Sequence, residues 1–273
     1  MRQYRLIYDQ PTTGARNMAV DEAIMSAVAA GDSPPTLRLY AWDPPTLSLG
    51  YGQPWQDADL ARLQRLGWGI VRRITGGRAI LHTDELTYSI ALPADHPLAT
   101  GTIIESYRRI SRALVHMVES FGTTPQADQR AERIKPSQAG PVCFEVPSHY
   151  EITTADHRKL IGSAQGRRRG VVLQHGSLPL YGDITRIVDA LAYPTEHDRK
   201  IARNRVRGRA ATLADALNGQ HITWEHTANQ LALAFARTFD ANLVEDTLTA
   251  AEQTEAHRLE RDLYATDAHI RRL

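Results

Sequence analysis

The sequence predicts an α+β fold in which helices flank a mixed, mostly antiparallel sheet. Three apolar strand patterns follow one another closely at 149–153, 159–165 and 171–180. The turns that join them, TADH and GRRRG, are too short for the crossover that parallel strands need, so we expect an antiparallel meander here. Helical periodicity then takes over, at 183–191, within 195–218, at 224–239 and at 250–264.

The N-terminal part of the chain alternates strand and helix patterns. YRLIYD, at 4–9, is typical of a strand, and NMAVDEAIMSAVAAGD, at 17–32, has the periodicity of a helix. We expect Asn17 to cap this helix and Gly31 to end it. TLRLYAW and TLSLGYG, on either side of Asp43-Pro44-Pro45, predict two strands and a turn.

The middle of the chain carries clear helix boundaries. DLARLQRLG, at 59–67, predicts a short helix that ends at Gly67. GIVRRI and LTYSIAL, at 69–74 and 86–92, predict strands. Thr102 and Glu105 form a capping-box pattern at the start of a helix whose apolar residues recur at helical spacing up to Gly122.

A polar stretch at 123–141 leads to Cys143, the single cysteine of the 273 residues. The stretch contains proline and glycine and shows no periodicity, which predicts a long mobile loop. One cysteine excludes an internal disulfide and favours a reducing, cytoplasmic location. The segment MRQYRLIYDQP lacks the apolar run of a signal peptide, and no run of 18 apolar residues could span a membrane.

The charge of the chain is unevenly distributed. The formal net charge is +1, but residues 158–209 carry twelve basic side chains against four acidic ones, Asp183, Asp189, Glu196 and Asp198. Such a segment fits an acidic partner, either nucleic acid or protein. A solvated, arginine-rich face is the alternative that composition alone leaves open.

The stretch VRRITGGRAILH, at 71–82, is the first candidate site. A strand that ends in arginines, a hydroxyl residue and two glycines lets backbone N–H groups approach a carbonyl, carboxylate or phosphate. The stretch matches neither a P-loop nor a dinucleotide fingerprint. From the pattern alone, a pair such as Gly76-Gly77 between two strands is more often a hairpin turn than a ligand-binding turn.

Cys143 and Lys159 form the second candidate site. A nearby ammonium lowers the pKa of a thiol and so favours the nucleophilic thiolate. A tight turn at 154–157 would bring the two side chains to one side of the sheet. The alternatives are a buried, inert cysteine and a solvent-facing lysine at the edge of a strand.

LQHGSL, at 173–178, is the third candidate site, since His175 and Ser177 share one face of an apolar strand. His175 fits a general base, a ligand-orienting donor or a hydrogen-bonded core residue. The histidines lack the spacing of metal ligands and H-E-x-x-H is absent, so no metal is expected.

Taken together and in this order, the stretches RRITGGRAILH…ELTYS, CFEVPSHYEI, KLIGSAQ and LQHGSL resemble the biotin/lipoate protein ligase superfamily. They are most similar to its LipM-type octanoyltransferases, and NMAVDEAIM and PTLRLYAWDPPTLSLGYGQ fit the same family. The resemblance runs from about residue 4 to about residue 210. It implies a fold related to the cores of class II aminoacyl-tRNA synthetases.

The resemblance also implies roles for individual residues. Cys143 would accept the octanoyl group as a thioester, and Lys159 would lower the pKa of its thiol and position the acyl carbonyl. The acyl pocket would be lined by Arg73, Thr75, Gly76, Gly77 and Arg78 and bordered by His82, Ser163, Ala164 and His175. Residues 1–210 would form the catalytic domain, with 211–273 as a helical extension packed on it.

The implied activity is that of an acyltransferase in lipoate biosynthesis. The donor would be octanoyl-acyl carrier protein and the acceptor a lysine of a lipoyl-domain protein such as the glycine cleavage H protein. We expect a monomer that needs no cofactor and binds neither nucleic acid nor membrane. The arginine runs lack the interleaved aromatic residues typical of single-strand binding.

Three other functions compete with this one. An ATP-dependent lipoate–protein ligase would work through an acyl-adenylate, and an amidotransferase would move octanoyl between lipoyl domains. A non-catalytic module would only bind a lipoyl domain or RNA. Arg78, where the ligases carry a third glycine, and the presence of Cys143 favour the transferase over the ligase.

Overall fold

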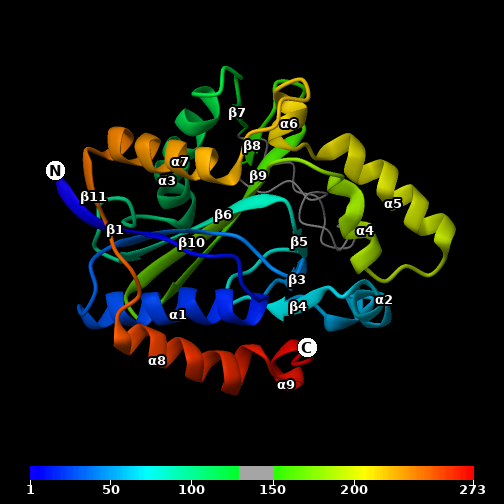
Figure 1. Cartoon of the computed structure of the whole chain (residues 1–273), viewed down its shortest axis with the longest axis horizontal. Helices are drawn as coiled ribbons and strands as arrows, with labels where there is room; N and C mark the ends of the chain where they lie inside the picture. The colour runs from blue at the N-terminus through cyan, green and yellow to red at the C-terminus, as the bar shows by residue number, and fades with distance from the viewer. Residues whose placement is uncertain (129–150) are drawn as a thin grey trace.

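Eight strands form the main sheet of the computed structural model, which describes residues 1–128 and 151–273 (Figure 1). They are β1 (Arg2–Tyr8), β2 (Thr36–Tyr40), β6 (Glu85–Pro93), β7 (Gln126–Asp128), β8 (Glu151–Thr153), β9 (Lys159–Arg168), β10 (Val171–Pro179) and β11 (Ala241–Glu245). Their order in space is β11-β1-β2-β6-β10-β9-β8-β7. Only the β11–β1 and β1–β2 pairs are parallel, so the sheet is mixed and mostly antiparallel as predicted.

A second sheet has three strands, β3 (Thr46–Leu49), β4 (Gly69–Arg72) and β5 (Ile80–His82). The central strand β3 runs parallel to β4 and antiparallel to β5. The segment through Gly76 and Gly77 therefore joins two strands that do not pair with each other, and the hairpin alternative is wrong. Strands β2 and β3, predicted around Asp43-Pro44-Pro45, both form, but each belongs to a different sheet.

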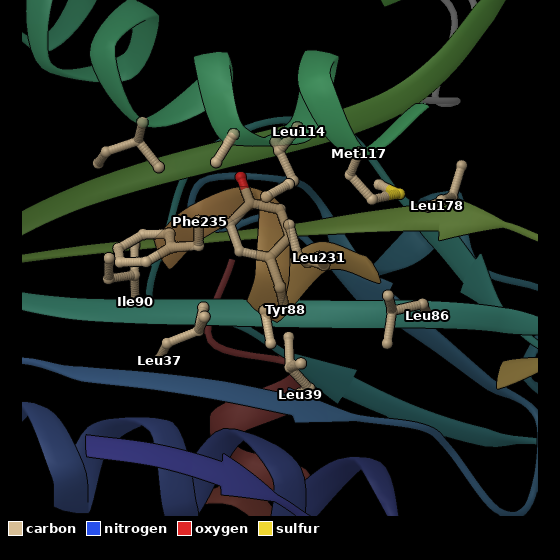
Figure 2. Packing of buried hydrophobic residues seen from close by; sticks show 14 of the residues in the cluster. Leu37, Leu39, Leu86, Tyr88, Ile90, Leu114, Met117, Leu178, Leu231 and Phe235 are labelled. Atoms are coloured by element: carbon tan, nitrogen blue, oxygen red, sulfur yellow. The ribbon is translucent and has the colours of Figure 1, made fainter. Parts of the chain in front are cut away.

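Helices cover both faces of the main sheet (Figure 1). The long helices α1 (Gly14–Ala30) and α8 (Ala250–Leu259) lie along one face. Helices α3 (Ile103–Glu119) and α7 (Trp224–Phe239) lie along the other. Figure 2 shows how tightly the second face is packed: side chains of β2, β6 and β10 meet those of α3 and α7. The residues labelled there are Leu37, Leu39, Leu86, Tyr88, Ile90, Leu114, Met117, Leu178, Leu231 and Phe235.

A smaller apolar cluster holds the three-stranded sheet in place. Leu47 and Leu49 of β3 and Ile80 of β5 pack with Val188 and Leu191. The helical elements around this sheet are η1 (Trp55–Asp57), α2 (Leu60–Leu66), η4 (Ile184–Arg186), α4 (Ile187–Ala190) and α5 (Glu196–Arg209). The remaining short elements are α6 (Leu213–Ala216), η5 (Glu260–Tyr264) and α9 (Asp267–Ile270).

The structure confirms the predicted helix boundaries at Thr102, Gly31 and Gly67, and corrects the one at Asn17. Thr102 and Glu105 form the predicted capping box of α3, and Gly31 and Gly67 end α1 and α2 in the left-handed conformation. Asn17, however, is not a cap, because the side chain of Thr13 accepts the hydrogen bond at the start of α1. Asn17 lies fully buried within the helix, where its amide donates to the carbonyls of Thr12 and Ala41.

The predicted loop at 123–141 and the predicted helical extension each contain a strand. Part of the predicted loop at 123–141 is the short strand β7, which pairs with β8, and its remainder from 129 onward lies outside the described residues, as does Cys143. The predicted helical extension contains a strand as well as helices, because β11 pairs with β1 at the edge of the main sheet. The domain boundary at residue 210 stays a prediction. In the part of the chain that the structure describes, no helix is long and apolar enough to cross a membrane.

Candidate active site

A small pocket lies between the main sheet, α1 and the small sheet. Strand β9 contributes Gly162 and Ala164 to its wall. The other lining residues are Met18, Tyr40, Trp42, Ser48, Arg73, Ile80, His82, Thr87, His175, Gly176 and Ser177. Polar and apolar side chains both line the pocket, but the surface that they expose to it is mostly apolar, which suits a ligand with an aliphatic chain.

A buried carboxylate, Glu85, organises the polar side of the pocket. Its Oε1 lies 2.6 Å from Nδ1 of His82 and accepts from the Thr87 hydroxyl at 2.5 Å. Its Oε2 accepts from the Ser177 hydroxyl at 2.5 Å. The indole of Trp42 stacks on the His82 ring at 3.9 Å and donates its N–H to Thr87. The pocket wall is therefore held by hydrogen bonds between residues of several strands.

A second carboxylate, Asp21 of α1, is also buried. Arg38 donates to it at 2.9 Å, and Tyr40 and Ser89 donate at 2.9 and 2.7 Å. Burial raises the pKa of Asp21, but the hydrogen bond from His175 and the charge of Arg38 outweigh burial, so the pKa lies below its usual value. Asp21 is therefore ionised at neutral pH.

His175 joins Asp21 to the glycine turn. Its Nδ1 lies 3.4 Å from Oδ2 of Asp21, and its Nε2 lies 2.6 Å from the Thr75 hydroxyl. Burial lowers the pKa of His175 by more than the Asp21 carboxylate raises it, so the ring is neutral. An ionised carboxylate can only accept, which assigns the ring proton to Nδ1 and makes Nε2 the acceptor of the Thr75 hydroxyl.

The glycine turn between β4 and β5 is closed by Arg73. The guanidinium of this buried residue donates to the carbonyls of Gly76 and Arg78 at 3.0 and 2.7 Å, and to the Ser48 carbonyl at 2.9 Å. Gly77 has a φ of +101°, which a side chain would strain. The backbone of Gly76 and Gly77 is exposed, so a ligand can approach it.

Lys159 begins β9 and is buried, with only 4% of its surface exposed. The predicted alternative of a solvent-facing lysine is therefore wrong. Its Nζ lies 2.9 Å from Oε1 of Glu151, across the 154–158 turn. Cys143 lies outside the described residues, so its contact with Lys159 stays a prediction.

The other predicted site residues differ in how close they lie to the pocket. Arg73, His82, Ala164 and His175 line it. Thr75 contacts the lining residue His175, and the carbonyls of Gly76 and Arg78 accept hydrogen bonds from the lining residue Arg73. Gly77 packs against Gly50 beside the pocket. The Ser163 side chain points to the opposite face of the sheet, where its hydroxyl lies 2.8 Å from that of Tyr88.

Several residues at the site were not predicted from the sequence. They are Asp21, Tyr40, Trp42, Ser48, Glu85 and Thr87. One signal was available: in ELTYSIAL, polar residues recur every second position in a strand that is otherwise apolar. Among residues 1–128 and 151–273, no group of three or more His, Cys, Asp or Glu side chains could hold a metal.

Solved structures that share this fold are lipoate–protein ligases. A bipartite lipoate protein ligase from Thermoplasma acidophilum superposes with a TM-score of 0.84 at 24% identity, covering 100% of this chain and 98% of the other. A lipoate-protein ligase A bound with ATP superposes with a TM-score of 0.81 at 24% identity, covering 100% of both chains. This chain therefore has the fold of these two ligases, as the resemblance implied.

The sequence comparisons are more specific. The lipoyl protein ligase A/B catalytic domain matches residues 13–236. A protein named octanoyltransferase LipM from Kyrpidia tusciae is 42% identical over 265 residues, 95% of each chain. Another of that name from Brevibacillus brevis is 37% identical over 272 residues, 98% of each chain. The chain therefore belongs to the lipoyl protein ligase A/B family, among its LipM octanoyltransferases.

Proposed function

We propose that this chain transfers an octanoyl group from octanoyl-acyl carrier protein to a lysine of a lipoyl-domain protein such as the glycine cleavage H protein. The transfer passes through a thioester on Cys143, in lipoate biosynthesis, and the chain acts as a cytoplasmic monomer without a metal or other cofactor. The observation that carries the proposal is the largely apolar pocket beside the exposed Gly76-Gly77 backbone. It suits an aliphatic acyl chain whose carbonyl lies at the glycine turn.

The first step is a thioester exchange. The Cys143 thiolate attacks the octanoyl carbonyl, the bond from that carbon to the sulfur of the carrier breaks, and the departing thiolate takes up a proton. One thioester replaces another, so the step is near energetic balance and needs no ATP. The buried ammonium of Lys159 would lower the pKa of the Cys143 thiol, and backbone N–H groups at the glycine turn would stabilise the oxyanion.

The second step forms an amide. The amine of the target lysine attacks the acyl carbon, the bond to Cys143 breaks, and the amine proton passes to the departing thiolate. Amide formation from a thioester is downhill, so the product is stable. Two half-reactions through a covalent intermediate predict ping-pong kinetics.

Intact-protein mass spectrometry tests this mechanism. The chain is mixed with octanoyl-acyl carrier protein without ATP, and we expect one octanoyl adduct that hydroxylamine removes. Cys143→Ser should give no hydroxylamine-labile adduct. Lys159→Met should slow formation of the adduct at least tenfold, because the thiol loses its neighbouring charge. Lys200→Met, at an exposed position on α5, is the matched control and should react normally.

The same experiment distinguishes the competing functions. In parallel mixtures that contain octanoate, ATP and a lipoyl domain, octanoylation of the lipoyl domain that requires ATP and survives Cys143→Ser would indicate an acyl-adenylate ligase and overturn the proposal. Labelling from an octanoylated lipoyl domain but not from the carrier protein would indicate an amidotransferase. A chain that binds a lipoyl domain and never acquires an adduct would be a binding module.

A further inference from the structure

Much of the basic segment at 158–209 is engaged within the protein. Arg167 donates to the carbonyls of Ala99, Gly101 and Thr102, and so ties β9 to the segment before α3. Arg199 is buried and donates to the carbonyls of Val188 and Leu191. Arginines that already bind backbone carbonyls are poor candidates for binding a partner. Arginines without such bonds are better candidates.

Two arginines, Arg168 and Arg272, instead lie against one aromatic ring. The guanidinium carbon of Arg272 lies 3.8 Å from the centre of the Tyr51 ring, and that of Arg168 lies 4.7 Å from it. All three side chains are exposed, and across residues 1–128 and 151–273 no carboxylate lies within ion-pair distance of either arginine. We call Tyr51, Arg168 and Arg272 the arginine–tyrosine rim. Two uncompensated positive charges held on one aromatic ring attract an anion.

The rim is assembled from three distant parts of the sequence, and hydrogen bonds join the two segments that carry Tyr51 and Arg272. Arg72, fully buried, donates to the carbonyls of His269 and Ile270 and also to those of Gly50 and Gln53. The backbone N–H of Trp55 donates to the carbonyl of Leu273 at 3.3 Å. These bonds fix residues 269–273 against the segment that carries Tyr51. The fold therefore brings Tyr51 and Arg272 together.

The rim borders the candidate active site. The N–H of Tyr51 donates to the carbonyl of Thr75 at 2.8 Å, and Thr75 in turn contacts His175. Gly50 packs directly on Gly77, since a Cβ at Gly50 would lie 2.0 Å from the Gly77 carbonyl oxygen. The hydrogen bond and charge of Arg272, with a smaller contribution from Arg168, lower the pKa of the Tyr51 hydroxyl. A partner seated on the rim would lie next to the glycine turn.

We propose that the arginine–tyrosine rim is the docking point for an acidic surface of the carrier protein that delivers the acyl thioester. The inference rests on the proposed function, because that function supplies a protein donor. Charge complementarity at an interface mainly raises the association rate and makes it sensitive to salt. The rim therefore acts on capture of the donor and leaves the chemical step at the pocket unchanged.

The test is the double variant Arg168→Glu/Arg272→Glu, compared with the unmodified chain. Acylation of Cys143 is followed with three octanoyl donors: the carrier protein, free phosphopantetheine and neutral pantetheine. We expect kcat/KM for the carrier protein to fall at least tenfold and its salt dependence to flatten, with both small donors unchanged. Arg112→Glu/Arg237→Glu, on α3 and α7, makes the same change in net charge at exposed sites and should behave as the unmodified chain.

Each other outcome overturns the inference. Unchanged kcat/KM for the carrier protein would show that it docks elsewhere. An equal loss with free phosphopantetheine would assign the rim to the phosphate of the donor's arm, and an equal loss with pantetheine to the pocket. A loss confined to the second half-reaction would assign it to the acceptor.

A binding measurement keeps this inference separate from the proposed function. The affinity of the chain for octanoyl-acyl carrier protein is measured with Cys143→Ser, which cannot form the thioester. The same charge reversal in that background should weaken binding at least tenfold. If the unmodified chain is never acylated, the proposed function fails, while the binding measurement still decides whether the rim holds the carrier protein.

Discussion

The two faces of strand β6 are equally buried and differ in almost everything else. Leu86, Tyr88 and Ile90 point into the apolar cluster with α3 and α7 (Figure 2). Glu85, Thr87 and Ser89 point the other way, towards α1 and the pocket. The hydroxyls of Thr87 and Ser177 donate to Glu85, and the hydroxyl of Ser89 donates to Asp21. One face packs mainly apolar side chains, and on the other face polar side chains form hydrogen bonds with one another.

This difference teaches where a pocket can form in a sheet that is covered on both sides. On the α3 and α7 face, side chains interdigitate, and each contributes by leaving water. On the α1 face, Glu85 and Asp21 each accept several hydrogen bonds, which offsets the cost of burying a carboxylate. A hydrogen-bonded scaffold holds its side chains in fixed positions, so a cavity beside it can persist.

The largest effect on stability is expected from Asp21→Asn. Arg38 is fully buried and keeps only Asp9, whose side chain is 30% exposed, as a carboxylate partner. Leaving a buried charge poorly compensated should lower the free energy of unfolding by about 4 kcal/mol. Urea denaturation at pH 7 measures the loss. Asp9→Asn, which removes the more exposed partner of the same arginine, should cost far less.

The pH dependence of that loss follows from the lowered pKa of Asp21. The stabilisation is complete above the pKa of the unfolded chain and disappears as the pH falls through the lower pKa of the folded chain. The difference between the unmodified chain and Asp21→Asn should therefore shrink in acid. A difference that stays constant down to pH 3 would mean that folding does not lower the pKa of Asp21.

A smaller loss in the free energy of unfolding is expected from Ile90→Ala, on the apolar face. Ile90 is fully buried between the sheet and Phe235, and truncation should cost about 3 kcal/mol through lost burial and the cavity left behind. The rate of Cys143 acylation should not change, because the side chain points away from the pocket. Ile90→Val, which removes one methylene, should cost about 1 kcal/mol. A slower rate in the folded variant would show that the two faces are coupled.

The smallest effect concerns His96, which lies beside Tyr4 on the apolar face. Burial, aided by the charge of Arg2, lowers the pKa of His96 to about 4. The contribution of the neutral His96 ring to stability should be complete above pH 6.5 and should be lost as the pH drops towards 4, since the unfolded chain binds the proton more readily. NMR titration of the ring measures the pKa, and His96→Gln should flatten the dependence. A pKa near 6.5 would contradict the prediction.

Local signals in the sequence predicted most of the elements. The capping box at Thr102 and the glycine ends of α1 and α2 depend on residues within a few positions, so the sequence shows them directly. Asn17 was misread because Thr13 competes for the same role and the buried partners of Asn17 come from another segment. Strand β11 was missed because its partner β1 lies at the opposite end of the sequence.

The site was predicted less completely than the fold. Arg73, before the glycine turn, and His82, Ala164 and His175 belong to motifs, and the structure brings them to one pocket. The burial of Lys159 could not be read from a strand-edge position. Asp21 and Glu85 carry no motif either, since their role comes from Arg38, Tyr40 and Ser177, which reach them only after folding.

The way residues 269–273 are fastened has a practical consequence for recombinant protein. Leu273 lies beside Trp55, and Arg272 beside Tyr51, so an affinity tag fused after Leu273 would emerge next to the arginine–tyrosine rim. The other end is safer, because Met1 lies at a distant edge of the molecule, near Asp240 (Figure 1). Kinetic work is best done with the tag at Met1 or removed.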